Sequence, residues 1–594
     1  MGFGVELILT NHALYHLEIG SRSVNSAASL FYYRISRGSK GVDFSEPLQR
    51  LIMLRIDQVL SMPENREFKM LQIGRRTALV FAIVLMAFEC GPSTASGEQA
   101  PDLRTPEPPQ TPHLNGPKLY GVRPGNPFLY RIPCTGNRPM GYSARNLPAS
   151  LKLDRLSGII SGKAPEKPGE YDVALRASNA LGKDSRHFKI VVGEQIGLTP
   201  QMGWNDWYAY YSHVTNRDIR TAAAALITSG MADYGYQYVD VDDAWARNPG
   251  SDNPALNGPV RDSRGDILSN ARFPDMRALA DYIHSLGLKA GIYTSPGPST
   301  CAGFEGSYQH EDADAHQFSN WGFDLLKYDW CSFGKVAKGE TLADMQEPYK
   351  KMGAILEVLD RDIILNMCQY GMGDVWKWGR QAGGNSWRTT GDLGSVRNAS
   401  LPGFYKVGFA NAVLSDYAGA GGWNDPDYIL IGAVGDANSA DLAPRPTALT
   451  HEEQYSYMSL WSLMAAPLLF SGEMTKLDEF TLNVLCNSEV IDIDQDSLGK
   501  QGVIVRKTDE EFILEKPLED GSWAVGLFNL TNEPRSISAD WEDLGLKGRQ
   551  TVRDVWRQSN LGLFEGNFSS KVPGHGVIMV RLDPKTFIRR SPKR

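Results

Sequence analysis

The chain has 594 residues, more than a single domain usually holds, so two or three units are expected, each able to bury a core. Charged residues make up 22% and hydrophobic residues 42% of the chain, which is typical of globular proteins and excludes a disordered or fibrous class. The 61 basic and 69 acidic side chains give a formal charge of -8, which argues against a nucleic-acid binder and suits a neutral small molecule or polysaccharide.

Residues 70–97 have the layout of a secretory signal peptide. A pair of arginines precedes an apolar run from Ala78 to Phe88, and small residues follow it. The run is too short to span a bilayer comfortably, so we expect no membrane span and export to the periplasm or the exterior. Because a signal peptide should begin a protein, Met70 is interpreted as the start and residues 1–69 as a mis-called extension. Cys90 lacks the small residues of a lipoprotein box before it, so lipid anchoring is the minor alternative.

Residues 98–117 are rich in proline and are predicted to form an extended linker. From residue 118 to 194, short alternating runs such as FLYRI and YDVALRAS are separated by Gly, Pro and Asn, which predicts a small β-sandwich. The phrases of this segment resemble the immunoglobulin-like modules found beside catalytic domains in exported bacterial enzymes. We expect a spacer or a weak binding module here, because the segment carries no cluster of carboxylates or histidines.

Residues 195–498 alternate apolar strands with amphipathic helices. The strand candidates are PQMGWN, YQYVDVDDAW, LKAGIYTS, FDLLKYDW, DIILNMCQY, SWRTTGD, GGWNDP and PLLFSG. The helical patterns between them include RDIRTAAAALITSGMADYG, DMRALADYIHSLG, EPYKKMGAILEVLDR and EEQYSYMSLWSLMAA. This alternation predicts an α/β fold, a (β/α)8 TIM barrel. An open doubly wound sheet is the alternative, but it would need a Gly-rich phosphate turn after its first strand, and the sequence has none there.

Polar residues end these apolar strands, and in a TIM barrel the active site lies at the carboxyl-terminal ends of the strands. These residues are Trp204, Asp242, Asp243, Tyr293, Lys327, Asp329, Cys368, Gln369, Arg388, Asp392, Asp425 and Asp427. Solvent-facing turns would not place carboxylates at the same end of strand after strand. We therefore predict that these side chains converge on one cavity.

Several carboxylates with an arginine, a lysine and tryptophans favour glycoside hydrolysis. The histidines show no HExxH or comparable spacing, which argues against metal-dependent hydrolysis, and the barrel has no GxSxG elbow of a serine hydrolase. In glycoside hydrolysis one carboxylate attacks the anomeric carbon, a second protonates the leaving oxygen, and Trp faces stack on sugar rings. The chemistry requires two Asp side chains with different partners.

Seven segments carry a resemblance to a known family: TPQMGWNDW, YVDVDDAW, GIYTSPGPSTCAG, DLLKYDWC, GNSWRTTGDL, GGWNDPDYILIG and SLWSLMAAPLLFSG. They resemble the signature blocks of glycoside hydrolase family twenty-seven, the melibiase-type alpha-galactosidases, in order from about Thr199 to the end of the chain. The resemblance implies a retaining, exo-acting alpha-galactosidase that uses galactose-containing oligo- or polysaccharides and needs no metal or organic cofactor. By the same resemblance Asp329 is the nucleophile and Asp392 is the acid and base.

The resemblance also assigns the residues that bind the sugar. Asp242 and Asp243 would hold the axial 4-hydroxyl and the 6-hydroxyl, and Lys327 the 3- and 4-hydroxyls. Arg388 and Asp427 would contact the 2-hydroxyl side. Lys327 precedes the nucleophile by two residues on a strand, so it points to the same face and helps to keep that carboxylate ionised.

Four further residues complete this implied site. Trp204 would pack on the sugar, and Tyr293 would line the site near the nucleophile. Cys368 is expected to remain a free thiol near the sugar. Gln369, with no obvious bulky side chain nearby, favours a free 2-hydroxyl over an acetamido group.

The cysteines and two tyrosines show where the chain follows the family and where it departs from it. Cys301 in STCAG and Cys331 in KYDWC match a disulfide that the family places beside the site, and export would permit this bond. Ala244 stands where relatives often carry a cysteine, so a second bridge is absent. Tyr370 and Tyr428 stand where many members have Trp and Met, and both should line the pocket rim and its 2-position side.

Residues 499–585 contain strand candidates such as GVIVRK, FILEKPL and GVIMVRL, which predict a C-terminal antiparallel β-sandwich of the kind that the family carries. Two alternatives share the barrel and differ in pocket lining, a beta-L-arabinopyranosidase and an alpha-N-acetylgalactosaminidase. A non-catalytic carbohydrate-binding protein would lack one of the two acids, whereas both are present. The sequence leaves the oligomeric state open.

Overall fold

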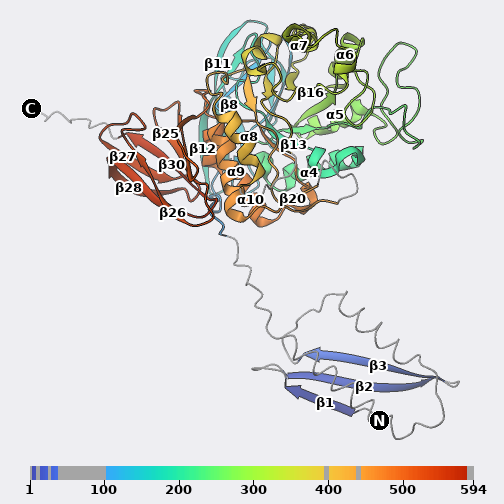
Figure 1. Cartoon of the computed structure of the whole chain (residues 1–594), viewed down its shortest axis with the longest axis vertical. Coiled ribbons are helices and arrows are strands. Elements are labelled where there is room, and N and C mark those ends of the chain that lie inside the picture. Colours follow the sequence, from blue (N-terminus) through green and yellow to red (C-terminus); the bar gives the residue numbers. More distant parts are fainter. Residues whose placement is uncertain are drawn as a thin grey trace, which may run out of the picture. The chain divides into compact units, whose positions relative to one another are not determined.

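The structure, a computed structural model, describes residues 3–8, 14–24, 28–37, 102–393, 401–435 and 443–584. The chain divides into two compact units, Met1–Gln99 and Ala100–Arg594. In the first unit the described strands β1 (Phe3–Ile8), β2 (Leu14–Val24) and β3 (Ala28–Arg37) form an antiparallel sheet in that order (Figure 1). The predicted signal peptide, residues 70–97, lies outside the described residues, and both it and the interpretation of residues 1–69 stay predictions.

Eight parallel strands form one sheet at the centre of the second unit, in the order β19-β18-β17-β16-β15-β14-β13-β22. Their bounds are β13 (Met202–Asn205), β14 (Tyr238–Asp240), β15 (Lys289–Thr294), β16 (Leu325–Asp329), β17 (Ile364–Cys368), β18 (Ser386–Arg388), β19 (Trp423–Asp425) and β22 (Leu468–Phe470). A parallel bridge between Ile429, just after β19, and Phe470 of β22 joins the two ends of the sheet. The sheet therefore closes on itself, and the predicted TIM barrel with its eight strands is confirmed.

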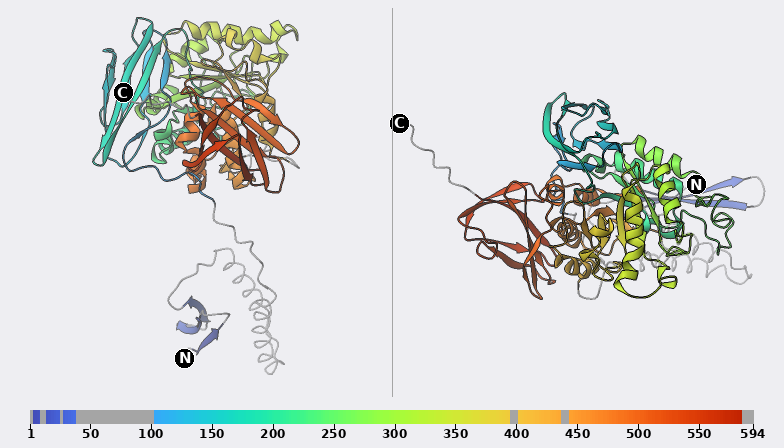
Figure 2. Two further views of the ribbon diagram at one scale, coloured as in Figure 1. Left: turned by 90° about the vertical axis from the view of Figure 1, so that its left-hand side faces the viewer. Right: turned by 90° about the horizontal axis from the view of Figure 1, so that it is seen from above.

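Helices alternate with these strands and cover the outside of the barrel (Figure 2). The α-helices are α3 (Trp207–Tyr210), α4 (Asn216–Thr228), α5 (Met276–Ser285), α6 (Glu311–Trp321), α7 (Leu342–Glu357), α8 (Gly403–Ala412), α9 (His451–Leu463), α10 (Glu479–Leu485) and α11 (Ser488–Asp494). Thr215, Thr341 and Thr450 each begin a helix with a complete capping box, which satisfies backbone N–H groups that the first turn leaves unpaired. Within the described part of the chain, no helix combines the length and apolarity that crossing a bilayer would require.

Two sheets and a short strand pair form a sandwich before the barrel. The strands are β4 (His113–Leu114), β5 (Leu119–Val122), β6 (Pro127–Arg131), β7 (Cys134–Thr135), β8 (Gly141–Arg145), β9 (Leu151–Leu153), β10 (Ile159–Lys163), β11 (Gly169–Asn179) and β12 (Gly182–Val192). The sheets have the orders β5-β12-β11-β8 and β6-β10-β9, and β4 pairs with β7. Alternating residues such as Val173, Leu175 and Ala177 of β11 face the buried core between the sheets. The predicted N-terminal sandwich is confirmed.

A second sandwich follows the barrel. Its strands are β23 (Val503–Lys507), β24 (Glu511–Pro517), β25 (Trp523–Asn529), β26 (Arg535–Asp540), β27 (Arg549–Asp554), β28 (Ser559–Glu565), β29 (Asn567–Val572) and β30 (Val577–Pro584). Antiparallel pairing gives a six-stranded sheet, β23-β24-β25-β30-β27-β28, and a two-stranded sheet, β26-β29. The sandwich packs on α9, where the Trp556 indole N–H donates to Ser459 Oγ at 2.8 Å (Figure 1). The predicted C-terminal sandwich is confirmed.

The prediction of a linker at residues 98–117 is wrong for two described parts of this range, since Arg104 and Thr105 pack against the barrel and β4 (His113–Leu114) belongs to the N-terminal sandwich. Residues 106–111 between them are exposed. Arg104 is buried, its amide donates to the Tyr455 hydroxyl at 3.0 Å, and its guanidinium lies 4.4 Å from the centre of the same ring. The amide and hydroxyl of Thr105 bond to Asn483 of α10. Proline content predicts an extended backbone correctly but does not show whether that backbone is free, because a docked segment can be equally extended.

Candidate active site

The predicted polar residues come together at the carboxyl-terminal end of the barrel strands. Asp242 and Asp243 follow β14, Lys327 and Asp329 end β16, and Asp427 lies two residues after β19. Tyr293 on β15, Cys368 and Gln369 at the end of β17, and Arg388 at the end of β18 complete the group. None of these residues is more than 8% exposed, so the site is recessed into the barrel mouth. Their convergence is the expected consequence of closing a parallel sheet into a barrel.

Backbone strain gathers at the same end of the barrel. Ala244, Ser332, Tyr370 and Asp427 follow the ends of four different strands, and their φ angles are 79°, 55°, 64° and 97°. Residues with a side chain rarely adopt this left-handed region, and such conformations cost about 1–3 kcal/mol each. Conformations of this kind persist where the surrounding structure enforces them, which is typical of a functional site.

Asp329 is a buried carboxylate, and its neighbours have opposite effects on its pKa. The Tyr370 hydroxyl donates to its Oδ1 at 2.6 Å. Burial raises the pKa of Asp329, the charge of Lys327 and the Tyr370 hydrogen bond oppose this rise, and the charges of Asp392 and Asp242 add to it. The predicted help that Lys327 gives in keeping Asp329 ionised therefore agrees with the direction of its electrostatic effect.

Asp392 lies in a contrasting environment, because its side chain is 59% exposed. Arg388 Nη2 lies 3.2 Å from Asp392 Oδ1 and 2.9 Å from Asp427 Oδ2. Asp427 Oδ2 also accepts a hydrogen bond of 2.8 Å from the amide of Leu393, which follows Asp392 in the chain. Arg388 therefore holds the carboxylate of Asp392, and Asp427 holds the backbone next to it, while the rest of the Asp392 side chain is exposed to solvent. An exposed carboxylate of this kind can exchange protons with water and with a leaving group.

Asp242 is the centre of a hydrogen-bond network in the recess. Its Oδ2 accepts from Lys327 Nζ at 2.8 Å, from Asn205 Nδ2 at 2.8 Å and from the Tyr428 hydroxyl at 3.0 Å. The Lys327 ammonium also lies 5.2 and 5.1 Å from the ring centres of Tyr293 and Tyr428. These contacts fix the ammonium at one place, so that it can serve as a rigid donor to a ligand.

Asp243 is tied to the loop that follows β15. Its Oδ1 accepts from the amide of Ala244 at 2.6 Å, and its Oδ2 accepts from the amide of Ala302 at 2.8 Å. Burial raises the pKa of Asp243 to about 7, although these amide hydrogen bonds favour the charged form. Each oxygen has a second lone pair, so this carboxylate can still accept hydrogen bonds from hydroxyl groups.

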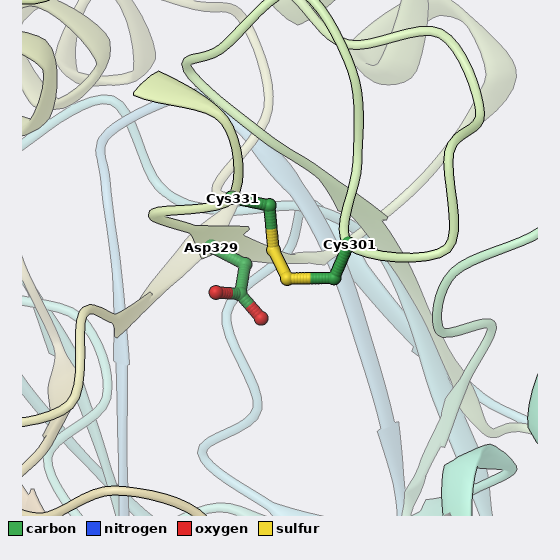
Figure 3. Close-up of side chains that lie close together, drawn as sticks. All are labelled: Cys301, Asp329 and Cys331. Atoms are coloured by element: carbon green, nitrogen blue, oxygen red, sulfur yellow. A yellow bond between two sulfur atoms is a disulfide. The ribbon is translucent and has the colours of Figure 1, made fainter. Parts of the chain in front are cut away.

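The predicted pair Cys301 and Cys331 is joined by a disulfide in the structure, with 4.9 Å between the two Cα atoms. Figure 3 shows this bond directly beside the Asp329 carboxylate. The two cysteines lie on the loops after β15 and β16, so the bond ties together two walls of the recess. Among the described residues, these three form the one cluster whose ligand atoms lie close enough to surround a metal ion. While the disulfide is intact, neither sulfur atom is a thiolate that could bind a metal ion.

Arg388 is the centre of the part of the recess that the resemblance assigns to the 2-hydroxyl. Burial raises the pKa of Asp427 to about 6, and the neighbouring Arg388 opposes that rise. Arg388 Nη1 also donates toward Cys368 Sγ at 3.6 Å, and Cys368 is a buried free thiol as predicted. Gln369 Nε2 donates to the carbonyl of Met372 at 3.0 Å, which orients the amide group within its own loop.

Comparison with known proteins agrees with this geometry. Residues 199–496 match the family model described as Alpha galactosidase A, and residues 512–582 match the alpha-galactosidase C-terminal beta sandwich domain. An Ig-domain family model matches residues 111–193. The chain belongs to the melibiase-type alpha-galactosidase family. It is therefore a glycoside hydrolase with the domain arrangement that its sequence predicts.

Relatives of this family member include plant and bacterial proteins. An alpha-galactosidase of Cyamopsis tetragonoloba is 36% identical over 69% of this chain and 93% of its own length. An alpha-galactosidase A of Cellvibrio japonicus is 34% identical over 66% of this chain and 94% of its own. A solved Bacteroides fragilis structure, of a protein provisionally assigned as an alpha-galactosidase/melibiase, is 35% identical with a TM-score of 0.74, and the match covers 81% of this chain and 100% of that one.

One predicted site residue of this melibiase-type chain occupies an unexpected position. Trp204 is 0% exposed, and its indole N–H donates to the carbonyl of Gly472 at 2.8 Å. Its contact with a sugar therefore stays a prediction, because the ring has no exposed face in the structure. Asp425, one of the strand-end carboxylates, accepts from Asn366 Nδ2 and from the amide of Asp427, so it supports the site from behind.

Two functional contacts were missed from the sequence. Asn205 is the last residue of β13 and donates to Asp242, so the strand-end rule that identified its neighbours could have identified it as well. Tyr370 was predicted to line the rim, whereas its hydroxyl contacts the candidate nucleophile. No sequence pattern indicates this contact, since it depends on the backbone conformation at that residue.

Proposed function

We propose that the chain removes terminal alpha-linked D-galactose from oligo- or polysaccharides by retaining double displacement. The observation that carries this proposal is the pair of unlike carboxylates at the barrel mouth, buried Asp329 and exposed Asp392, in a chain of the alpha-galactosidase family. A buried carboxylate with a fixed cation nearby suits nucleophilic attack, and an exposed carboxylate suits proton exchange. The family relatives named above support galactose as the sugar.

The reaction takes two steps on these residues. In the first, an Asp329 oxygen attacks the anomeric carbon while Asp392 donates its proton to the departing glycosidic oxygen. In the second, Asp392 takes a proton from water, the water oxygen attacks the same carbon, and the bond to Asp329 breaks. Two inversions at one carbon give net retention. Lys327 lowers the electrostatic cost of keeping Asp329 ionised before the first step.

The binding roles follow the network around Asp242. Lys327, which donates a hydrogen bond of 2.8 Å to Asp242, would also donate to the 3- and 4-hydroxyls of galactose, and Asp242 would accept from the 4-hydroxyl. Asp243 would accept from the 4- and 6-hydroxyls, and Arg388 with Asp427 would contact the 2-hydroxyl. A panel of para-nitrophenyl glycosides on the purified protein tests this assignment. Alpha-galactoside should be the best substrate, and preference for another glycoside would contradict it.

Asp243→Glu tests which residue selects galactose. Wild type is expected to prefer alpha-galactosides over beta-L-arabinopyranosides by at least about 10-fold, an effect of about 1.4 kcal/mol, because Asp243 bonds the hydroxymethyl group that the arabinoside lacks. The longer side chain would leave the amides of Ala244 and Ala302 and enter the space for that group. The variant should therefore lose galactoside turnover first and shift the kcat/KM ratio toward the arabinoside.

Asp243→Asn is the matched control for this experiment, since it keeps the size of the side chain and removes its charge. It should weaken the hydrogen bonds to the sugar without filling the space for the hydroxymethyl group, so its shift toward the arabinoside should be smaller than that of Asp243→Glu. If wild type already favours the arabinoside, or if Asp243→Glu leaves the ratio unchanged, Asp243 does not select the sugar and the galactose assignment loses its main support.

We also propose that the protein is exported. The signal-peptide pattern of residues 70–97 supports export, and the Cys301–Cys331 disulfide is of a kind that persists in oxidising compartments. N-terminal sequencing of the protein secreted from a bacterial host tests the proposal. A mature chain that begins near Gly97 is expected, whereas an uncleaved chain retained in the cytoplasm would contradict export.

A further inference from the structure

Tyr370 occupies a position from which its hydroxyl reaches three atoms of the site at once. It donates to Asp329 Oδ1 at 2.6 Å and lies 3.5 Å from Cys301 Sγ and 3.8 Å from Cys331 Sγ. Burial raises the pKa of Tyr370 above its ordinary value, so the hydroxyl stays protonated and remains a donor. The short distance is typical of a hydrogen bond to a charged acceptor.

This contact requires an uncommon backbone conformation at Tyr370. Tyr370 has a φ of 64°, which is an outlier for a bulky residue, and it begins the loop that follows β17. The next residue, Gly371, also has a positive φ, 84°. Two consecutive left-handed residues turn the chain sharply and bring the ring back over β16, where Asp329 lies. The strain therefore supports one specific contact, that with the nucleophile.

The contact distinguishes the two oxygens of Asp329. Oδ1 accepts the Tyr370 hydrogen bond, and within the described part of the chain Oδ2 is neither hydrogen-bonded nor fully buried. We propose that Tyr370 is a positioning residue that holds Oδ1 through both steps of the reaction and leaves Oδ2 as the attacking oxygen. This proposal rests on the function proposed above.

The hydrogen bond from Tyr370 to Asp329 contributes more to the second step of the reaction than to the first. When the bond from C1 to Oδ2 forms and the glycosidic bond breaks, Asp329 becomes a neutral ester and Oδ1 its carbonyl oxygen. When water attacks C1, the bond from C1 to Oδ2 breaks and its electron pair returns to the carboxylate. A hydrogen bond is stronger to the charged carboxylate than to the ester, so Tyr370 makes Asp329 a better leaving group. The tyrosine proton stays on its oxygen throughout.

The other groups that face Asp329 determine the sign of the pH effect. Lys327 on the same strand and Tyr370 after β17 favour the charged form, whereas Asp392 after β18 and Asp242 after β14 disfavour it. Without the Tyr370 hydroxyl, burial and the two carboxylates still raise the pKa of Asp329, and of the groups named here only Lys327 still lowers it. The pKa of Asp329 in the free enzyme should therefore rise.

Three further titratable groups face Asp329, and each stays uncharged at the pH values where a carboxylate titrates. Burial raises the pKa of Tyr293 on β15, of Cys368 on β17 and of Tyr349 on α7 well above their ordinary values. Neutral neighbours of this kind add no charge that could mask the change at Asp329.

Tyr370→Phe is the test, because it keeps the ring and removes the hydroxyl. With an aryl galactoside, kcat should fall at least about tenfold and KM should fall with it, since the galactosyl-enzyme accumulates when its breakdown slows. Rapid mixing should show a larger burst of aryl alcohol than wild type gives. The acidic limb of the kcat/KM profile should move to higher pH.

Tyr210→Phe is the matched control, since the Tyr210 hydroxyl also donates to a carboxylate, Glu473 Oε1 at 2.8 Å, which is not the candidate nucleophile. It should leave the pH profile and the burst unchanged. A Tyr370→Phe enzyme with the burst, KM and acidic limb of wild type would overturn the positioning role. Failure of the proposed function would show differently, as activity that survives in Asp329→Ala.

Discussion

Asp329→Ala is expected to lose at least about 10³-fold in turnover, a loss of about 4 kcal/mol in transition-state stabilisation, because the covalent route disappears with the carboxylate. The space left by the side chain lies within the electrostatic reach of the Lys327 ammonium, so a small anion such as azide should enter it. Azide should then attack the anomeric carbon from the vacated side, restore part of the activity on an aryl alpha-galactoside, and give the beta-galactosyl azide.

Asp392→Ala with azide is the matched control for that result. In this variant Asp329 still forms the galactosyl-enzyme, and azide replaces water in the second step, so the alpha-galactosyl azide is expected. The two products can be distinguished by the coupling constant of the anomeric proton in their NMR spectra. If Asp329→Ala gave the alpha-azide, or kept its activity without azide, Asp329 would not be the nucleophile.

Asp392→Ala should also show a strong dependence on the leaving group. General acid catalysis contributes about 10²- to 10⁴-fold, and only substrates with a poor leaving group need the proton on departure. Natural oligosaccharides should therefore lose activity by about that factor, whereas aryl galactosides with acidic alcohols should lose far less in kcat/KM. The exposed position of Asp392 makes folding damage small, because surface substitutions usually change stability by about 0.5 kcal/mol or less.

Comparing kcat/KM over a series of aryl galactosides with leaving groups of different pKa measures this dependence. Wild type should show a shallow slope, and Asp392→Ala a steep one. Equal losses for good and poor leaving groups would show that Asp392 is not the acid.

The barrel could be predicted because its strands are unusually clear in the sequence. Each parallel strand is buried on both faces, so it reads as a continuous apolar run that ends in a polar residue. The helices were less clear. In α6, EDADAHQFSNW, the side chains of Glu311 and Asp314 are buried, since Lys351 and Arg261 pair with them, so the apolar stripe of an amphipathic helix is missing. In α8 most residues are buried, and no polar face marks a helical period.

The candidate site could be predicted as a set of residues but not as a set of contacts. The strand-end rule and the family resemblance placed Asp329, Lys327 and Asp242 on one cavity, and the structure brings them together. Neither could show that Tyr370 bonds Asp329, because the contact depends on a left-handed backbone that most sequences avoid. Long-range packing of this kind also decided the position of residues 102–117, whose composition alone indicates a linker.

Proton NMR of the first sugar released from an alpha-galactoside tests the retaining pair most directly. If Asp329 and Asp392 act by double displacement, the alpha anomer of galactose should appear first, and the beta anomer should follow only as the free sugar mutarotates. Wild-type protein at high concentration makes the first spectra fast enough to separate the two processes. Beta-galactose as the initial product would mean a single displacement by water and would contradict the role of Asp329 as nucleophile.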